Sequence, residues 1–179
     1  AGDVAGASGL FNQAQPLDGP LQRWRDYRSA QFALLSDPEL AEQLIAQATP
    51  FPPPQPFVSR TARELEQAAG ALRAAVTEER DIRVVTVARL WAAEGLLPAA
   101  QVLYQQIPPT SPVAPIALEE LARLQLGQGD SAGALATIST AIDLFPDAAL
   151  LWRTRATLAA AVGDIEQASL ALDAAERLE

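Results

Sequence analysis

The 179-residue sequence lacks cysteine, histidine, methionine and lysine, so that all 13 of its basic residues are arginine. Without cysteine and histidine there is no disulfide, no zinc site of the usual kinds and no Cys/His or Ser/His catalytic pair. The absence of lysine also excludes a lysine nucleophile or Schiff base. An enzyme with this composition is restricted to paired carboxylates, tyrosine or a carboxylate-bound metal.

Paired carboxylates are scarce as well. The adjacent pairs are Glu78–Glu79 and Glu119–Glu120, and neighbours on a helix point about 100° apart. Neither pair therefore converges by itself on a common point, as the groups of a catalytic site must. We predict no catalytic residue, no metal and no cofactor, and keep an enzyme that uses carboxylates only as an alternative.

A run of positive charge is also missing. The formal net charge is −9, whereas a nucleic-acid binder needs a basic patch against phosphates. The densest basic stretch, Arg23, Arg25 and Arg28, is interrupted by Asp26 and aromatic residues, and we interpret it as a solvated helix face. No apolar stretch reaches the roughly 18–20 residues of a membrane span. The sequence thus predicts neither a nucleic-acid partner nor a membrane span.

Alanine and leucine are abundant. Hydrophobic residues make up 49% and charged residues 20% of the chain, which is the balance of a globular protein. Strong helix formers fill most segments, so we predict an all-α protein. The chain does not begin with Met, and residues 1–19 show little periodicity, which indicates a flexible N-terminal segment. Together with the missing cysteine, this favours an exported, periplasmic location.

Two helices are predicted between residues 20 and 48. The first begins at Pro20, because proline suits the first helical turn, and runs to residue 35 with one apolar face. The sequence Ser-Asp-Pro-Glu at 36–39 ends it and starts a second helix, 38–48, with Asp37 as its cap. The apolar residues of this second helix are Leu40, Leu44 and Ile45.

A proline-rich segment, 50–57, separates these helices from a third. Five prolines between residues 49 and 57 preclude a helix and favour a stiff extended segment. We interpret it as a linker rather than as a ligand for an aromatic binding site. The third helix, 59–79, has Ser59 as its predicted cap. Its apolar stripe is Leu65, Ala69, Leu72 and Val76.

From about Asp81 the chain repeats itself. Three small turns carry Gly95, Gly129 and Gly163, which are 34 residues apart both times. Units that begin at residues 81, 115 and 149 then align small residues at their eighth and twentieth positions. These are Ala88, Ala122 and Ala156, followed by Ala100, Ala134 and Ala168. Position 24 is large in every unit, with Tyr104, Ile138 and Leu172.

This period and these positions resemble tetratricopeptide repeats over residues 81–179. The resemblance implies a right-handed α–α superhelix, a solenoid of three helical hairpins at 81–114, 115–148 and 149–179, with residues 20–80 as an N-terminal helical extension. The alanines would allow two helices to cross closely. One departure is Ile107-Pro108-Pro109, which ends a helix early, because proline inside a helix costs about 3 kcal/mol.

The resemblance also implies a binding surface, an inner groove lined by the first helix of each unit. The candidate residues are Ile82, Val85, Arg89, Ile116, Glu119, Glu120, Arg123, Leu150, Arg153 and Thr157. One subset of the family binds the carboxylate of chaperone tails with a clamp of basic and asparagine residues. Only Arg89 is basic at the five clamp positions, so we reject that ligand class. The alternative for the charged residues is that they pair with one another and merely solvate the groove.

The last helix has no capping helix after it, although many arrays of this family end in one. Its apolar residues Ile165, Leu170, Leu172 and Leu178 are therefore either exposed or covered by another copy, a partner or further chain. Our leading hypothesis is a non-enzymatic adaptor or assembly factor that binds a peptide or helix of a partner protein. The alternative is a structural subunit of a larger, envelope-associated complex, with self-association through the uncapped C-terminal hairpin.

Overall fold

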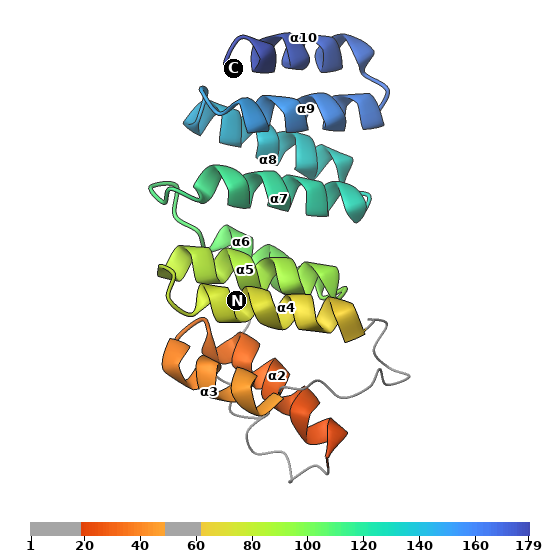
Figure 1. Cartoon of the computed structure of the whole chain (residues 1–179). Helices are drawn as coiled ribbons and strands as arrows, with labels where there is room; N and C mark the ends of the chain where they lie inside the picture. The colour runs from red at the N-terminus through yellow and green to blue at the C-terminus, as the bar shows by residue number, and fades with distance from the viewer. Residues whose placement is uncertain (1–18, 49–61) are drawn as a thin grey trace. The chain divides into compact units, whose positions relative to one another are not determined.

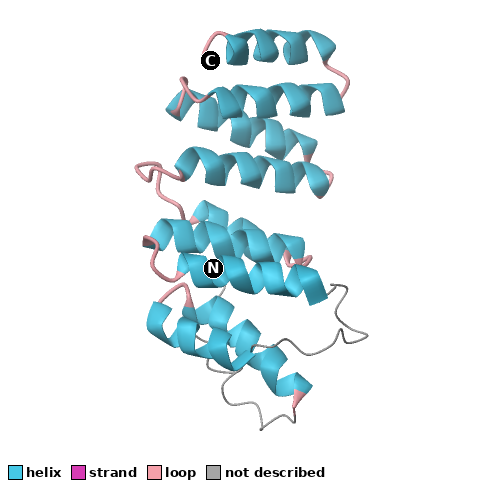
Figure 2. Cartoon of the chain, viewed as in Figure 1, coloured by secondary structure: helices cyan, strands magenta, loops and turns pink. Residues whose placement is uncertain are grey.

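A computed structural model describes residues 19–48 and 62–179 of the chain. Over these residues the protein contains nine α-helices and no β-strand (Figure 2). The predicted all-α class is thereby confirmed. The predictions for residues 1–18, for the segment 50–57 and for the Ser59 cap fall outside the described residues.

The helices form two compact units, one ending at Glu94 and the other beginning at Gly95. This division falls at the turn inside the first predicted repeat. The helices of the first unit are α2 (Pro20–Ala33), α3 (Pro38–Ala48), α4 (Ala62–Ala75) and α5 (Arg80–Ala93). Those of the second are α6 (Leu97–Gln105), α7 (Ala114–Gly127), α8 (Ser131–Leu144), α9 (Ala149–Ala161) and α10 (Ile165–Glu176).

Helices α2 and α3 follow their predicted bounds closely. Pro20 is the first residue of α2, and the Asp37 carboxylate accepts a 3.0 Å hydrogen bond from the Leu40 amide at the start of α3. The predicted apolar face of α3 needs correction. Leu40 is 41% exposed, and the buried residues are Ala41, Ile45 and Ala48. Their spacing of four and three places them on one face of the helix.

Helix α4 ends at Ala75 rather than at the predicted Glu79. The reason is that α5 begins at Arg80, and its N-cap residue Glu79 has an extended backbone, with ψ of 155°. An extended residue cannot continue a helix. Ala69 and Leu72 are buried as the apolar stripe predicted, and Val76 lies half-buried in the turn.

The three turn glycines share one backbone conformation. Gly95, Gly129 and Gly163 have φ of 79°, 84° and 83°. This is a left-handed backbone conformation, which residues other than glycine adopt at an energetic cost. After α7, the Asp130 amide bonds the Gln125 carbonyl at 2.9 Å, and after α9 the Asp164 amide bonds the Ala159 carbonyl at the same distance. This is the Schellman pattern, which satisfies carbonyls at a helix end. The period of 34 residues therefore has a matching local geometry.

The small residues predicted at the helix crossings are all buried. They are Ala88, Ala100, Ala122, Ala134, Ala156 and Ala168. In the second unit, α7 packs against α8 and α9 packs against α10. Alanine at these points lets two helix backbones approach closely, since it adds only a methyl group.

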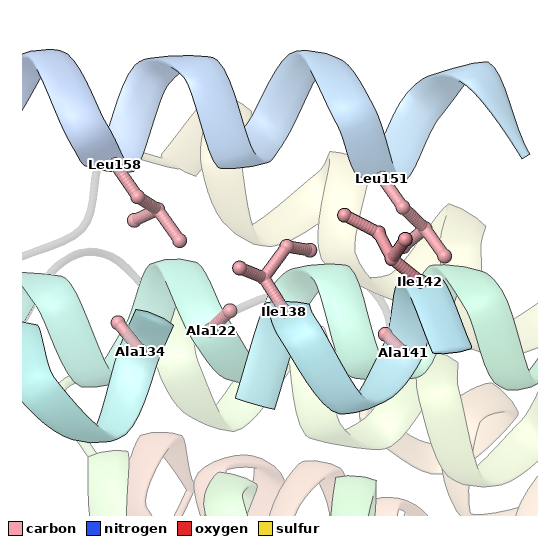
Figure 3. Packing of buried hydrophobic residues seen from close by; sticks show 7 residues of the cluster. All are labelled: Ala122, Ala134, Ile138, Ala141, Ile142, Leu151 and Leu158. Carbon is pink, nitrogen blue, oxygen red and sulfur yellow. The ribbon is translucent and has the colours of Figure 1, made fainter. Parts of the chain in front are cut away.

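The core of the second unit forms where α9 covers α8. Leu151 and Leu158 extend from α9 toward Ile138 and Ile142 of α8, with Ala122 of α7 beneath them (Figure 3). Ile138 and Leu151 are fully buried, and Leu158 is 1% exposed. The apolar area removed from water is the main stabilising contribution here, at about 25 cal/mol per Å².

Helix α6 is short, as the proline pair predicted. It ends at Gln105, and Ile107 is buried just before Pro108. Two turns follow before α7, in which the Ser111 amide bonds the Pro108 carbonyl at 2.9 Å and the Ala114 amide bonds the Ser111 carbonyl at 3.0 Å.

Candidate functional site

Helices α7 and α9 lie next to each other in the second unit (Figure 1), and they carry most of the candidate binding residues. Four of these residues are exposed, namely Arg123, Leu150, Arg153 and Thr157. Ile116 and Glu120 are half-buried, and Glu119 is buried. We call the exposed set, with Ile116 and Glu120 beside it, the α7–α9 face.

The buried residue of this group, Glu119, joins the two helices. Its Oε1 atom accepts a 3.0 Å hydrogen bond from the hydroxyl of Thr154 on α9. The same oxygen forms an ion pair with Nε of Arg123, one helical turn further along α7. A buried carboxylate needs such donors, because leaving it without them costs several kcal/mol. Glu119 was predicted as an exposed contact residue, and its burial corrects that prediction.

The Glu119 contact also orients Arg123. The Arg123 side chain is 62% exposed, whereas that of Glu119 is 8% exposed. Because the contact is made through Nε, the guanidinium is fixed at one edge while most of its surface faces solvent. Arginine has five N–H donors in a planar arrangement that suits carboxylates. Arg123 is therefore a positioned donor on the α7–α9 face.

The other two charges of the face have partners of their own. The Tyr104 hydroxyl of α6 donates a 2.5 Å hydrogen bond to Oε2 of Glu120 on α7. Arg153 forms an ion pair with Glu179, and both side chains are more than half exposed. Exposed pairs contribute about 0–1 kcal/mol, so a competing carboxylate can displace Glu179. The charges of this face are thus paired, Arg123 with Glu119 and Arg153 with Glu179.

The candidate residues of the first unit lie on α5. Arg89 is exposed and Ile82 is half-buried, but Val85 is only 4% exposed. Val85 was predicted as a contact residue, and its place in the core corrects that prediction. Helix α2 takes part in covering α5, since Nε of Arg83 donates a 3.0 Å hydrogen bond to the Leu34 carbonyl.

A polar network in the first unit was not predicted from the sequence. Oε1 of Glu94 accepts hydrogen bonds from the Tyr27 hydroxyl at 3.0 Å and from Nε2 of Gln31 at 3.1 Å. Arg28 forms an ion pair with the other oxygen of Glu94. The Trp91 ring nitrogen donates to Oε1 of Gln31 at 3.1 Å. These bonds hold α2 on the end of α5.

The side chains of the adjacent pair Glu119 and Glu120 do not converge. Glu119 points to Thr154 and Arg123, while its neighbour Glu120 accepts from Tyr104. Over residues 19–48 and 62–179, no three His, Cys, Asp or Glu residues are grouped as ligands for a metal ion. Among the same residues, no helix has the length and apolar character needed to cross a bilayer.

Comparison with known proteins does not assign the chain to a family. No protein-family model matches the sequence, and no curated protein matches it.

Proposed function

We propose that the chain is a non-enzymatic protein-binding module built from three tetratricopeptide-like repeats. The 34-residue period, the three left-handed glycines and the six buried alanines support this architecture. In this proposal the hairpins of 81–114, 115–148 and 149–179 follow one another as a right-handed α–α solenoid, and residues 20–80 cover its first helix. The protein acts as an adaptor or assembly factor.

The partner binds as a peptide or helix along the α7–α9 face. The observation that carries this proposal is the arrangement of Arg123, an exposed guanidinium fixed by a buried carboxylate. A side chain that is already fixed before binding loses less conformational entropy when the partner binds. Leu150, which is 40% exposed near the start of α9, adds an apolar contact elsewhere on this face. The face therefore suits a segment that combines carboxylates with one or two apolar side chains.

Site-specific photo-crosslinking tests this location. A photoreactive amino acid replaces Thr157 on the α7–α9 face in one protein and Thr140 on α8 in another. The two threonines are a matched pair, because both are exposed and each hydroxyl bonds the carbonyl four residues earlier, at 3.1 and 3.0 Å. We expect a partner protein to crosslink from position 157 only. Equal crosslinking from both positions, or none from 157, would contradict the proposal.

A structural subunit is the second candidate function. The observation that favours it is the exposed apolar surface of α10, where Ile165 is 68% and Leu172 is 48% exposed. Permanent subunits usually bury such surface in larger, more apolar interfaces than transient partners do. Sedimentation analysis separates the two candidates, because self-assembly predicts a mass that rises with protein concentration.

A further inference from the structure

The outer face of α10 repeats a surface that is covered elsewhere in the chain. We define the α10 outer face as Ile165, Ser169, Leu172 and Glu176. These residues follow Ser131, Leu135, Ile138 and Ile142 of α8 by 34 positions each. On α8 this surface is the one that α9 covers, with Leu151 and Leu158 packed against Ile138 and Ile142 (Figure 3).

The difference in exposure is large at the centre of this face. Ile138 is fully buried and its equivalent in the first repeat, Tyr104, is 3% exposed, whereas Leu172 is 48% exposed. Ile165 is 68% exposed, while its equivalent Ser131 is half-buried. The α10 outer face is therefore a surface shaped like one that receives a helix.

Two other exposed leucines of the last hairpin do not belong to this face. Leu170 is 54% exposed, but its equivalent on α8, Ala136, is exposed as well. Leu178 is 39% exposed, and its equivalent Leu144 is 48% exposed. These two positions face solvent on α8 even though α9 packs there. The exposure of Leu170 and Leu178 is therefore no evidence for a further helix on α10.

The charge around Leu172 indicates what kind of helix fits. Two neutral residues that lie beside α9 on α8, the half-buried Ser139 and the buried Ile142, are replaced on α10 by Asp173 and Glu176. Both carboxylates are exposed. Within the described residues, their side chains have no hydrogen bond or ion pair. A purely apolar neighbour like the one on α8 would leave these charges unmatched, whereas a basic one would complement them.

We propose that the α10 outer face binds a basic amphipathic helix of a partner protein, packed on α10 as α9 packs on α8. The helix carries two large aliphatic side chains seven residues apart, as Leu151 and Leu158 are, with arginine or lysine beside them. Helix α9 itself has this character, since it contains Arg153 and Arg155 and no acidic residue. This proposal does not rest on binding at the α7–α9 face.

A second copy of this chain is a poorer occupant. Pairing α10 with α10 would bring Asp173 and Glu176 of both copies together, and like charges across an interface oppose binding. The α9 helix of a second copy is not free to bind, because its Leu151 and Leu158 are already buried against α8.

The probe for the test is a peptide with the sequence of residues 148–162, which contains α9. A hydrocarbon staple between the positions of Thr157 and Ala161 holds it helical, since a free helix of this length is marginal in water. Both residues are exposed in the protein, so the staple leaves the aliphatic pair unchanged. Fluorescence polarisation measures its binding to the full chain.

Leu172→Ser and Leu170→Ser form the matched pair of protein variants. Both leucines are about half exposed, so neither substitution threatens the fold, and circular dichroism checks this. We expect Leu172→Ser to raise the dissociation constant of the peptide about tenfold or more, as loss of a central apolar contact does. Leu170→Ser leaves the dissociation constant unchanged. Crosslinking from position 157 is unaffected by either variant, which separates this test from that of the α7–α9 face.

Charge variants of the peptide and of the protein form the second part of this experiment. We expect a peptide with Arg153→Glu and Arg155→Glu to bind about tenfold more weakly at low salt. We expect the double variant Asp173→Asn, Glu176→Gln to lose the salt dependence of binding. Three outcomes would overturn the proposal. The stapled peptide does not bind at about 1 mM, the two leucine variants bind it equally, or sedimentation shows a dimer that Leu172→Ser abolishes.

Discussion

The hydroxyl of Thr154 on α9 donates a 3.0 Å hydrogen bond to the carboxylate of Glu119 on α7, and both residues are buried. This bond joins the first helices of two neighbouring repeats. It also fixes the carboxylate that holds Arg123. The candidate binding residue is thus positioned through a contact that serves the packing of the helices.

Replacing Thr154 with valine tests this contact. The substitution keeps the shape of the side chain but removes the donor, and a buried acceptor left unsatisfied costs about 1–3 kcal/mol. We expect the free energy of unfolding in urea to fall by that amount. Thr157→Val is the matched control on the same helix, because Thr157 is exposed, and its effect should stay within about 0.5 kcal/mol. Equal losses from the two variants would show that the Glu119 bond contributes nothing.

Glu94 is the centre of the contacts that hold α2 on α5. Its side chain is 5% exposed, and Glu94→Gln leaves Arg28 without its anion. Removing one partner of a buried pair costs about 3–5 kcal/mol. Arg28 is 30% exposed, so we expect a loss at the lower end, about 3 kcal/mol, with faster hydrogen exchange in α2. Glu78→Gln, at an exposed position, should change neither quantity. A stable Glu94→Gln protein with protected α2 amides would refute this role.

The turn glycines allow a comparison between two positions two residues apart. Gly129 has φ of 84°, and an alanine there is strained by about 1–2 kcal/mol. Gly127 is the last residue of α7 and has open space around its Cα, so alanine there is neutral or stabilises by up to about 1 kcal/mol. Thermal unfolding of the two variants should shift in opposite directions or by clearly different amounts. A lower melting temperature for Gly127→Ala than for Gly129→Ala would contradict the turn geometry.

The alanines at the helix crossings should tolerate no larger side chain. Ala134 on α8 is fully buried, and valine there overpacks the interface with α7, at a cost of about 1–3 kcal/mol. Ala136 is exposed on the same helix, so Ala136→Val corrects for the lower helix propensity of valine. The difference in unfolding free energy between the two variants therefore gives the cost of overpacking at the contact between α7 and α8. No difference would mean that α7 and α8 do not pack closely at Ala134.

Features that depend on local chemistry could be predicted from the sequence. The Asp37 carboxylate accepts a hydrogen bond from the amide three residues later, as its sequence position indicated, and Asp130 and Asp164 make the same contact. The left-handed turns needed glycine at fixed spacing, and the helix end at Gln105 followed from two prolines. In each case a single residue type restricts the local backbone, so that the structure at that point depends only on residues close in sequence.

Features that depend on distant contacts could not be predicted. Glu94 bonds Tyr27 and Gln31 across more than 60 positions of sequence, and nothing in the sequence around these residues distinguishes them from solvated polar residues. Glu119 was placed on an exposed surface, with no link to Thr154, because the repeat pattern treats each position alone. Their separation by one repeat and one residue is the signal that a pairwise comparison of adjoining units would have used.

The most direct test of the binding account is a pull-down with paired arginine variants. Arg123 and Arg153 are replaced by alanine in one protein, and Arg63 and Arg73, which are exposed on α4, are replaced in the other. Both variants lose two positive charges. The account predicts that the partner captured by the unmodified protein falls to about a tenth or less with the first variant, as truncation of central contacts does, and stays at full recovery with the second. Equal recovery by the two variants would contradict binding at the α7–α9 face.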